Sequence, residues 1–248
     1  MRGPSAYETI GRDYTGRRVP DPRIARRIHA ALGDAVTVLN VGAGAGSYEP
    51  KDRAVVAIEP SGVMLAQRSR SAAPAIQGVA EALPLPDGAF DAVLAILTVH
   101  HWADLDAGLR ELQRVARRRV VFGFDPSRQL DLWFTAEYVP ASAAFEEGRA
   151  PGVGHVADML GGARVEAVPV PHDCSDGFLG AYWRRPEAYL DPDVRASISS
   201  LAQLDQADVR PGVERLAADL ESGAWHERHG ALLDLDELDL GYRLFVSG

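Results

Sequence analysis

Three glycines at alternate positions mark the part of this sequence best suited to bind a ligand. Gly42, Gly44 and Gly46 follow an apolar run, a pattern typical of a buried strand that ends in a tight loop. Glycine accepts positive φ and lets the backbone approach a ligand that a Cβ atom would hold away. A dinucleotide fingerprint needs its third glycine at position 47, where Ser47 stands. The loop therefore predicts a nucleotide-like ligand and argues against a nicotinamide dinucleotide.

Three histidines are candidates for proton transfer. Histidine is the natural proton acceptor near neutral pH, and general acid–base catalysis contributes roughly 100-fold to 10,000-fold where it operates. His100 and His101 follow one apolar run and His172 follows another, so strand ends would bring them to one edge of a sheet. Two roles stay open: one of the three is a catalytic base, or the histidines cap and orient a loop.

The segments that must position these residues alternate between two hydrophobic periods. Strands are expected over 36–41, 55–58, 75–79, 92–97, 120–124, 163–170 and 240–246. Helices are expected over 22–32, 61–72, 104–117 and 210–221. This alternation predicts an α/β fold with a doubly wound sheet, whose ligands bind beyond the carboxyl ends of the strands.

Four sequence signals stand in the order and spacing of a known family. After the glycine loop come a strand that ends in Glu59, a loop over 78–87, a strand pattern over 90–95, and the segments 97–102 and 112–117. Together they resemble the small-molecule branch of the class I S-adenosylmethionine (SAM) dependent methyltransferases. The resemblance implies a Rossmann-like, seven-stranded, mostly parallel sheet with an antiparallel last strand and a helical lid.

The resemblance also implies which residues bind SAM as the cofactor. An acidic residue in the position of Glu59 holds the ribose hydroxyls in the family, and the loop after the third strand lies beside the adenine. The expected cofactor-binding residues are Asn40, Gly42, Ala43, Gly44, Gly46, Glu59, Pro60, Met64, Ala80, Glu81 and Leu97.

Three features depart from the family pattern. Asn40 stands where an acidic residue usually faces the methionine end of SAM, and Val79 stands where many relatives have aspartate against the adenine. In place of that aspartate, either Glu81 or the backbone at Ala80 is expected to accept the hydrogen bond from the adenine amino group. The seven residues 47–53 before the second strand leave room for at most one helical turn, although a parallel crossover normally takes a dozen or more.

The segments outside the strands are expected to cover the ligand. Residues 1–20 are predicted to form a flap that carries Tyr7 and Tyr14, and 127–162 and 172–230 to form helical insertions that act as a lid on a single domain. The expected substrate-binding residues are Tyr7, Tyr14, Trp102, Trp133 and Phe134. The alternative is that the aromatic side chains of the insertion fill a satellite core, which is the usual fate of large aromatics.

Composition limits the partners. The 248 residues carry a formal net charge of -9, which opposes binding to nucleic acid, and one cysteine, Cys174, excludes an internal disulfide. The single cysteine favours a cytoplasmic location, and no apolar run is long enough to span a bilayer or to serve as a signal peptide. A monomer or homodimer is expected. The histidine spacing matches no metal motif, so no metal site is expected.

The expected function is transfer of a methyl group from SAM to an oxygen, nitrogen or carbon atom of a small acceptor. Aromatic residues near the predicted site favour an aromatic or otherwise apolar metabolite. Two other classes stay open: a SAM-binding scaffold that does not consume SAM, and a nicotinamide-dependent oxidoreductase.

Overall fold

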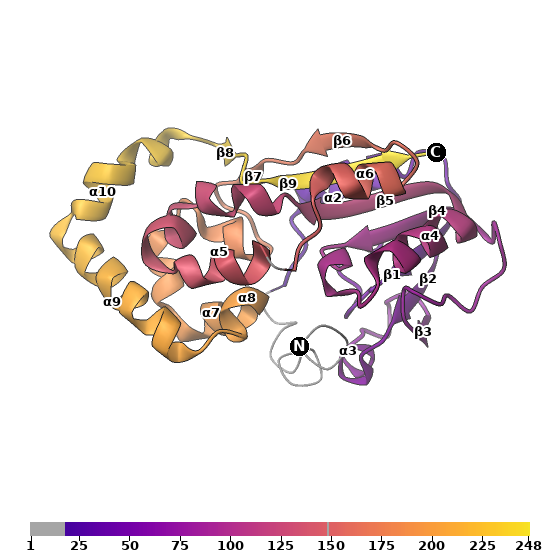
Figure 1. Cartoon of the computed structure of the whole chain (residues 1–248), viewed down its shortest axis with the longest axis horizontal. Coiled ribbons are helices and arrows are strands. Elements are labelled where there is room, and N and C mark those ends of the chain that lie inside the picture. The colour runs from indigo at the N-terminus through magenta and orange to yellow at the C-terminus, as the bar shows by residue number, and fades with distance from the viewer. Residues whose placement is uncertain (1–17, 148) are drawn as a thin grey trace.

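The computed structural model describes residues 18–147 and 149–248, which fold around one large sheet (Figure 1). Its seven strands lie in the spatial order β3-β2-β1-β4-β5-β9-β6. The strands are β1 (Thr37–Val41), β2 (Ala54–Glu59), β3 (Ala75–Gln77), β4 (Phe90–Ile96), β5 (Ala116–Phe124), β6 (Arg164–Ala167) and β9 (Tyr242–Ser247).

The strand pairing confirms the predicted fold class. Strands β1 to β5 pair in parallel, whereas β9 runs antiparallel to both β5 and β6. Val38 of β1 lies opposite Ala92 of β4, so these two strands are the expected central neighbours. The described residues therefore form a doubly wound, mostly parallel sheet with an antiparallel last strand.

Both faces of this sheet are buried, which explains why its central strands are almost continuously apolar. Successive residues point to opposite faces: Val38 packs in one core cluster and Leu39 in the other. Helix α2 (Pro22–Ala31) covers the first face, and α4 (Leu105–Val115) and α6 (Val153–Met159) cover the second.

Local sequence signals fix where the covering helices begin. Asp21 precedes α2, where its side chain accepts a hydrogen bond from the Arg23 N–H and Pro22 occupies the first helical position. Asp104 caps α4 in the same way through the Ala107 N–H. Local capping by an aspartate therefore sets the start of both helices.

A second group of helices lies beside the sheet rather than over it (Figure 1). It follows β5 and contains α5 (Pro140–Glu147), α7 (Pro192–Ser197), α8 (Ser199–Ala202), α9 (Gln206–Ser222) and α10 (Ala224–His229). Short helical turns connect them: η3 (Pro126–Asp131), η4 (Phe134–Tyr138), η5 (Leu179–Tyr182), η6 (Pro186–Leu190) and η7 (Gly230–Asp234). We call this group the helical lobe; its action as a lid stays a prediction.

Some predicted boundaries were wrong. The helix expected over 61–72 is the single short α3 (Gly62–Ala66), and the strand expected over 163–170 divides into β6 and β7 (Val170–Pro171). β7 pairs with β8 (Glu237–Leu238) in a separate two-stranded sheet that the sequence did not suggest. The expected lack of a helix between the glycine loop and β2 is confirmed.

The described part of the chain contains no helix with the length and apolar character needed to cross a bilayer. Tyr7 and Tyr14, predicted to lie in a flap, fall outside the described residues.

Candidate functional site

A cavity of about 1250 Å³ lies at the carboxyl ends of β1, β2 and β4. The glycine loop lines it, together with the end of β2, α3 and the segment after β4. All eleven residues expected to bind the cofactor line this cavity. The sheet therefore brings the predicted cofactor residues together at the edge where open α/β sheets bind ligands.

The glycines are required by the shape of this loop. Gly42 has φ +68, and a Cβ atom there would lie 2.0 Å from Thr98 Oγ1. Gly44 has φ +52 and faces the methyl group of Met64. Side chains at these positions would strain the backbone and fill space at the cavity wall. The loop is thus a cradle that keeps the backbone open to a ligand.

Glu59 lies at the end of β2 and is 6% exposed. Its Oε2 accepts from the Gly44 N–H at 2.8 Å, and its Oε1 accepts from the Ser61 N–H at 2.9 Å. A carboxylate can accept about four hydrogen bonds, so these contacts are compatible with two more from a ribose. Glu59 thus fixes the glycine loop and presents a charged acceptor at the cavity.

Asn40 belongs to a polar network that the sequence did not suggest. Its amide donates to Glu49 Oε1 at 3.2 Å, and Arg68 pairs with the same carboxylate at 2.7 Å. Arg68 also donates to the carbonyl of Gly44 at 3.0 Å. Glu49 therefore brings an acidic group to the cavity wall near the position where the family usually has one, and Arg68 balances its charge.

The loop expected beside the adenine also lines the cavity. Ala80 is buried there, and Glu81 contributes part of the wall. The carboxylate of Glu81 accepts from the Ala103 N–H at 2.7 Å, so it also ties this loop to the start of α4. Pro60 and Met64 line the cavity from the β2 side.

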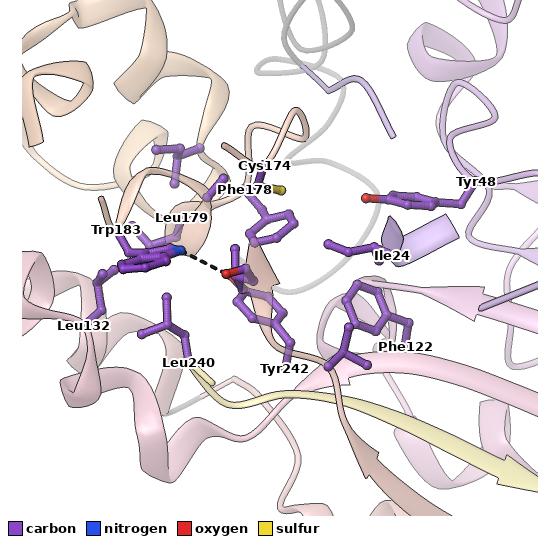
Figure 2. Close-up of a cluster of buried hydrophobic side chains, with 14 of the residues drawn as sticks. Ile24, Tyr48, Phe122, Leu132, Cys174, Phe178, Leu179, Trp183, Leu240 and Tyr242 are labelled. Carbon is purple, nitrogen blue, oxygen red and sulfur yellow. Dashed lines mark hydrogen bonds between the residues drawn. The ribbon is translucent and has the colours of Figure 1, made fainter. Parts of the chain in front are cut away.

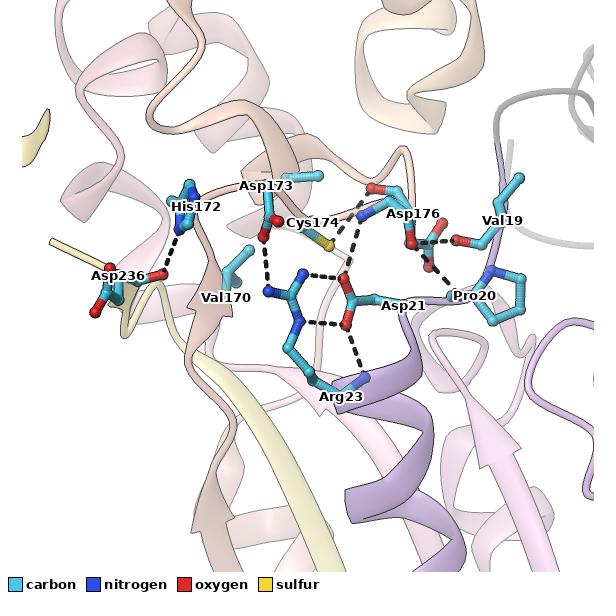
Figure 3. A network of polar contacts seen from close by, with 12 residues as sticks. Val19, Pro20, Asp21, Arg23, Val170, His172, Asp173, Cys174, Asp176 and Asp236 are labelled. Atoms are coloured by element: carbon cyan, nitrogen blue, oxygen red, sulfur yellow. Dashed lines mark hydrogen bonds and ion pairs between the residues drawn. The ribbon is translucent and has the colours of Figure 1, made fainter.

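The three histidines do not lie together. His101 lines the large cavity, and His100 lies behind it with its ring centroid 3.9 Å from that of His101. Burial lowers the pKa of His101 to about 3 and holds the pKa of His100 well below its usual range. His172 lies away from both, on the β7–β8 sheet, with Nδ1 3.1 Å from the carbonyl oxygen of Asp236 (Figure 3).

The expected position of His172 at the site was therefore wrong. His172 starts the turn after β7, and the antiparallel partner β8 draws that turn toward Asp236 rather than toward the carboxyl ends of the parallel strands. No sequence signal indicated this second sheet.

Among the described members of the predicted substrate set, Trp102 lines the large cavity. Its ring packs over Gly108 of α4, where a Cβ atom would lie 2.3 Å from the ring. The small residue on α4 therefore makes room for a flat wall at the cavity.

Trp133 and Phe134 lie elsewhere, in the core of the helical lobe. Trp133 donates from Nε1 to the carbonyl of Trp183 at 2.8 Å, and Phe134 stacks on Tyr189 with ring centroids 3.9 Å apart. Figure 2 shows Trp183 within the same buried cluster. The two residues are 5% and 0% exposed and line neither cavity of the site. Burial of their large apolar surface decides their position.

A second, smaller cavity of about 50 Å³ adjoins the first. Arg18, Leu97 and His101 line both cavities, so these residues lie where the two cavities meet, a place that we call the partition. The remaining wall comes from β4–η2 (Val99–His101), β5, the helical lobe and β9: His100, Phe124, Glu146, Phe178, Leu179, Ile198, Ser199, Ser200 and Tyr242. Figure 2 shows Phe178 and Tyr242 facing each other, with ring centroids 4.5 Å apart.

Leu97 has an unusual backbone at this partition. Its φ is +48, although it is not a glycine, and its N–H donates to the carbonyl of Phe122 at 2.7 Å. Such a conformation costs of order 1–3 kcal/mol and persists where the surrounding structure fixes it. The strand edge thus turns sharply and places Leu97 between the two cavities.

A polar network holds Arg18, which lines both cavities. Arg18 pairs with Asp176 at 2.5 Å, and the same carboxylate accepts from the Tyr48 hydroxyl at 2.9 Å. Next to it, Arg23 lies between Asp21 and Asp173 (Figure 3). These contacts join the start of the described chain to the segment before η5, so Arg18 is held at the partition.

The comparisons with known proteins agree with this geometry. A family model described as "Methyltransferase domain" matches residues 39–124, which run from β1 to the end of β5. The chain is 36% identical to a putative methyltransferase from an antibiotic biosynthesis pathway of Anabaena variabilis ATCC 29413, over 94% of this chain and 99% of that one, with a TM-score of 0.86. The chain belongs to the class I SAM-dependent methyltransferases.

Two curated relatives match over a shorter stretch of this methyltransferase. They are the malonyl-[acyl-carrier protein] O-methyltransferase of Erwinia pyrifoliae, 37% identical over 46% of this chain, and the demethylmenaquinone methyltransferase of Mycolicibacterium vanbaalenii, 36% identical over 44% of it. Each match spans 46% of the relative's own length. SAM is the cofactor of the family, and the cradle at Gly42 and the buried Glu59 fit it.

Proposed function

We propose that this protein transfers a methyl group from SAM to a small acceptor molecule. The observation that carries the proposal is the pair of adjoining cavities that share Arg18, Leu97 and His101. The large cavity has the glycine cradle and Glu59 that fit SAM. The small cavity offers a separate place for the reacting end of an acceptor.

When bound, SAM supplies a methyl group attached to a positively charged sulfur. Glu59 would hold the ribose, the glycine loop would carry the methionine part, and Met64 and Ala80 would flank the adenine. The protein's own contribution is to hold the acceptor in line and to exclude water, because proximity and orientation remove much of the barrier to such a displacement.

The walls of the small cavity favour an apolar or aromatic acceptor. Phe124, Phe178, Leu179 and Ile198 form the apolar part of the wall, which suits an apolar body. Polar side chains, such as those of Ser199, Ser200 and Tyr242, line the rest of it and suit a polar reacting group. The net charge of -9 also disfavours a polyanionic substrate. We therefore propose a small metabolite with a flat or apolar body and one reacting group.

A SAM-consumption assay tests this function. The wild-type protein is incubated with SAM and a panel of phenols, amines and polyketide-like acceptors, and mass spectrometry detects acceptors that have gained a methyl group. We expect at least one apolar acceptor to be methylated, and Glu59→Ala to reduce the rate at limiting SAM. Tight SAM binding with no methylated acceptor would favour a scaffold role, and calorimetry that shows tighter binding of NAD than of SAM would favour an oxidoreductase.

A further inference from the structure

Glu146 is a buried acid that the cofactor site does not use. It lies in the last turn of α5 and is 6% exposed, although its neighbour in the helix, Glu147, is exposed. Among residues 18–147 and 149–248, its Oε2 atom has no hydrogen-bond partner. Buried polar atoms nearly always have a partner, so an orphaned carboxyl oxygen calls for an explanation.

A second orphaned atom belongs to another residue that lines the same cavity. His100 is 7% exposed, and its Nδ1 has no hydrogen-bond partner within the described part of the chain. His100 comes from η2 at the edge of the parallel sheet, whereas Glu146 comes from the helical lobe, and both line the small cavity. Two unrelated elements thus bring unsatisfied polar groups to one place.

The size of this cavity limits what it can hold. A buried water needs about 10–15 Å³ of such space, and the small cavity has about 50 Å³. It therefore admits one functional group at the end of a larger molecule. The apolar side chains Phe178, Leu179 and Ile198 would contact the carbon atoms next to that group.

We propose that the small cavity is the acceptor subsite and that Glu146 accepts the proton from the acceptor's reacting O–H or N–H group. This inference rests on the proposed methyltransferase function. It narrows the acceptor to a neutral molecule with a hydroxyl or amine on an apolar or aromatic body. His100 contributes an imidazole nitrogen that accepts or orients a second hydrogen bond.

The step balances without a further reactant. The O–H or N–H bond of the acceptor breaks and its proton passes to the Glu146 carboxylate. The electron pair left on the acceptor forms the bond to the methyl carbon, and the pair of the broken carbon–sulfur bond stays on the departing sulfur, which becomes neutral.

The electrostatics of the site favour Glu146 over the histidines as the base. Burial raises the pKa of the Glu146 carboxyl to about 7, although the positive charge of Arg149 opposes the rise. The other titratable groups that face this cavity are Arg18, His100, His101 and Tyr242. A base is most effective when its pKa lies near the working pH, and His101, with a pKa of about 3, is far from it.

The test compares Glu146→Gln with Glu147→Gln, which changes the same residue type one position later on the exposed side of α5. We expect Glu146→Gln to lower kcat by about 100-fold or more and to leave the calorimetric Kd for SAM within about twofold. Glu147→Gln should match the wild type in both measurements. Glu146→Asp keeps a carboxyl group and should retain a measurable rate; it carries the test if the glutamine variant does not fold.

A second readout does not depend on turnover. In the ¹³C NMR spectrum of protein labelled at the glutamate carboxyl carbon, one resonance should titrate near pH 7 and should be absent from the spectrum of Glu146→Gln. The same resonance should shift when an acceptor that the enzyme methylates is added. Full activity of Glu146→Gln, with the wild type active, would overturn the role of Glu146 and leave the proposed function intact. A wild type that binds SAM and methylates nothing would overturn the proposed function and this inference with it.

Discussion

Replacement of Glu146 by glutamine should change how the free energy of unfolding depends on pH. Burial raises the pKa of this carboxyl from 4.5 to about 7. Between these values the folded protein binds a proton that the unfolded chain has already released, so the wild type loses stability as pH rises through this window. This loss of stability, caused by the buried negative charge, is absent well below pH 4.5 and complete well above pH 7.

The size of this effect follows from the shift. One pKa unit corresponds to about 1.4 kcal/mol, so the full penalty is roughly 3 kcal/mol, and about 2.5 kcal/mol of it develops between pH 5 and pH 8. Glutamine has nearly the same shape and cannot ionise. The stability of Glu146→Gln relative to the wild type should therefore increase by about 2.5 kcal/mol between these two pH values.

Urea unfolding at pH 5 and pH 8 measures this difference directly. Taking the variant relative to the wild type cancels the titration of all other groups. Glu147→Gln is the matched control, because its exposed side chain keeps its contact with water in both states. A relative stability of Glu146→Gln that is the same at both pH values, within about 0.5 kcal/mol, would refute the claim that this carboxyl is buried without compensation.

Four further predictions concern the cofactor cavity, the helical lobe and the β7–β8 sheet. Glu59→Ala should raise the calorimetric Kd for SAM by about 10-fold to 100-fold, since hydrogen bonds to a charged group contribute about 1.5–3 kcal/mol; an unchanged Kd would contradict the placement of the ribose. Gly42→Ala should destabilise the fold by about 1–3 kcal/mol more than Gly88→Ala in urea unfolding, because both have positive φ but only the first meets a neighbouring side chain; equal losses would contradict the steric reason. Trp133→Ala should lower the free energy of unfolding by about 3–5 kcal/mol; an unchanged stability would contradict its place in the buried core. His172→Ala should keep the full methylation rate in the SAM-consumption assay; an inactive variant would contradict its place away from the site.

The sheet and the cofactor edge could be predicted because each depends on local sequence. The apolar runs of β1, β4 and β5 are long enough to identify buried strands, and the three alternating glycines mark the loop without help from the rest of the chain. Glu59 is the last residue of its strand. The short stretch before β2 likewise excluded a helix by its length alone.

The acceptor side could not be predicted, because distant segments build it. Glu146 reaches the small cavity only through the packing of the helical lobe against the sheet, and Arg18 and Tyr242 come from opposite ends of the chain. Nothing near Glu146 in the sequence distinguishes it from the exposed Glu147. The position of Trp133 could not be predicted for a related reason, since an aromatic residue after β5 suits a pocket wall and a core equally well.

The polar network behind the glycine loop also could not be predicted from the sequence. Asn40 was recognised as an exception to the family pattern, but its partner Glu49 lies 9 positions later, and Arg68, which pairs with Glu49, lies 28 positions later. The pairing becomes visible only when the loop and α3 are brought together. A substitution in one motif was thus balanced by a residue outside it.

A crystal structure with S-adenosylhomocysteine tests the central claim most directly. We predict that the ligand lies in the large cavity, with its ribose hydroxyls within hydrogen-bond distance of Glu59 and its amino acid part along Gly42 and Gly44. Its sulfur should face the partition of Leu97 and His101, with the small cavity on the other side. A ligand bound elsewhere, or one whose sulfur points away from that partition, would contradict the account of two adjoining sites.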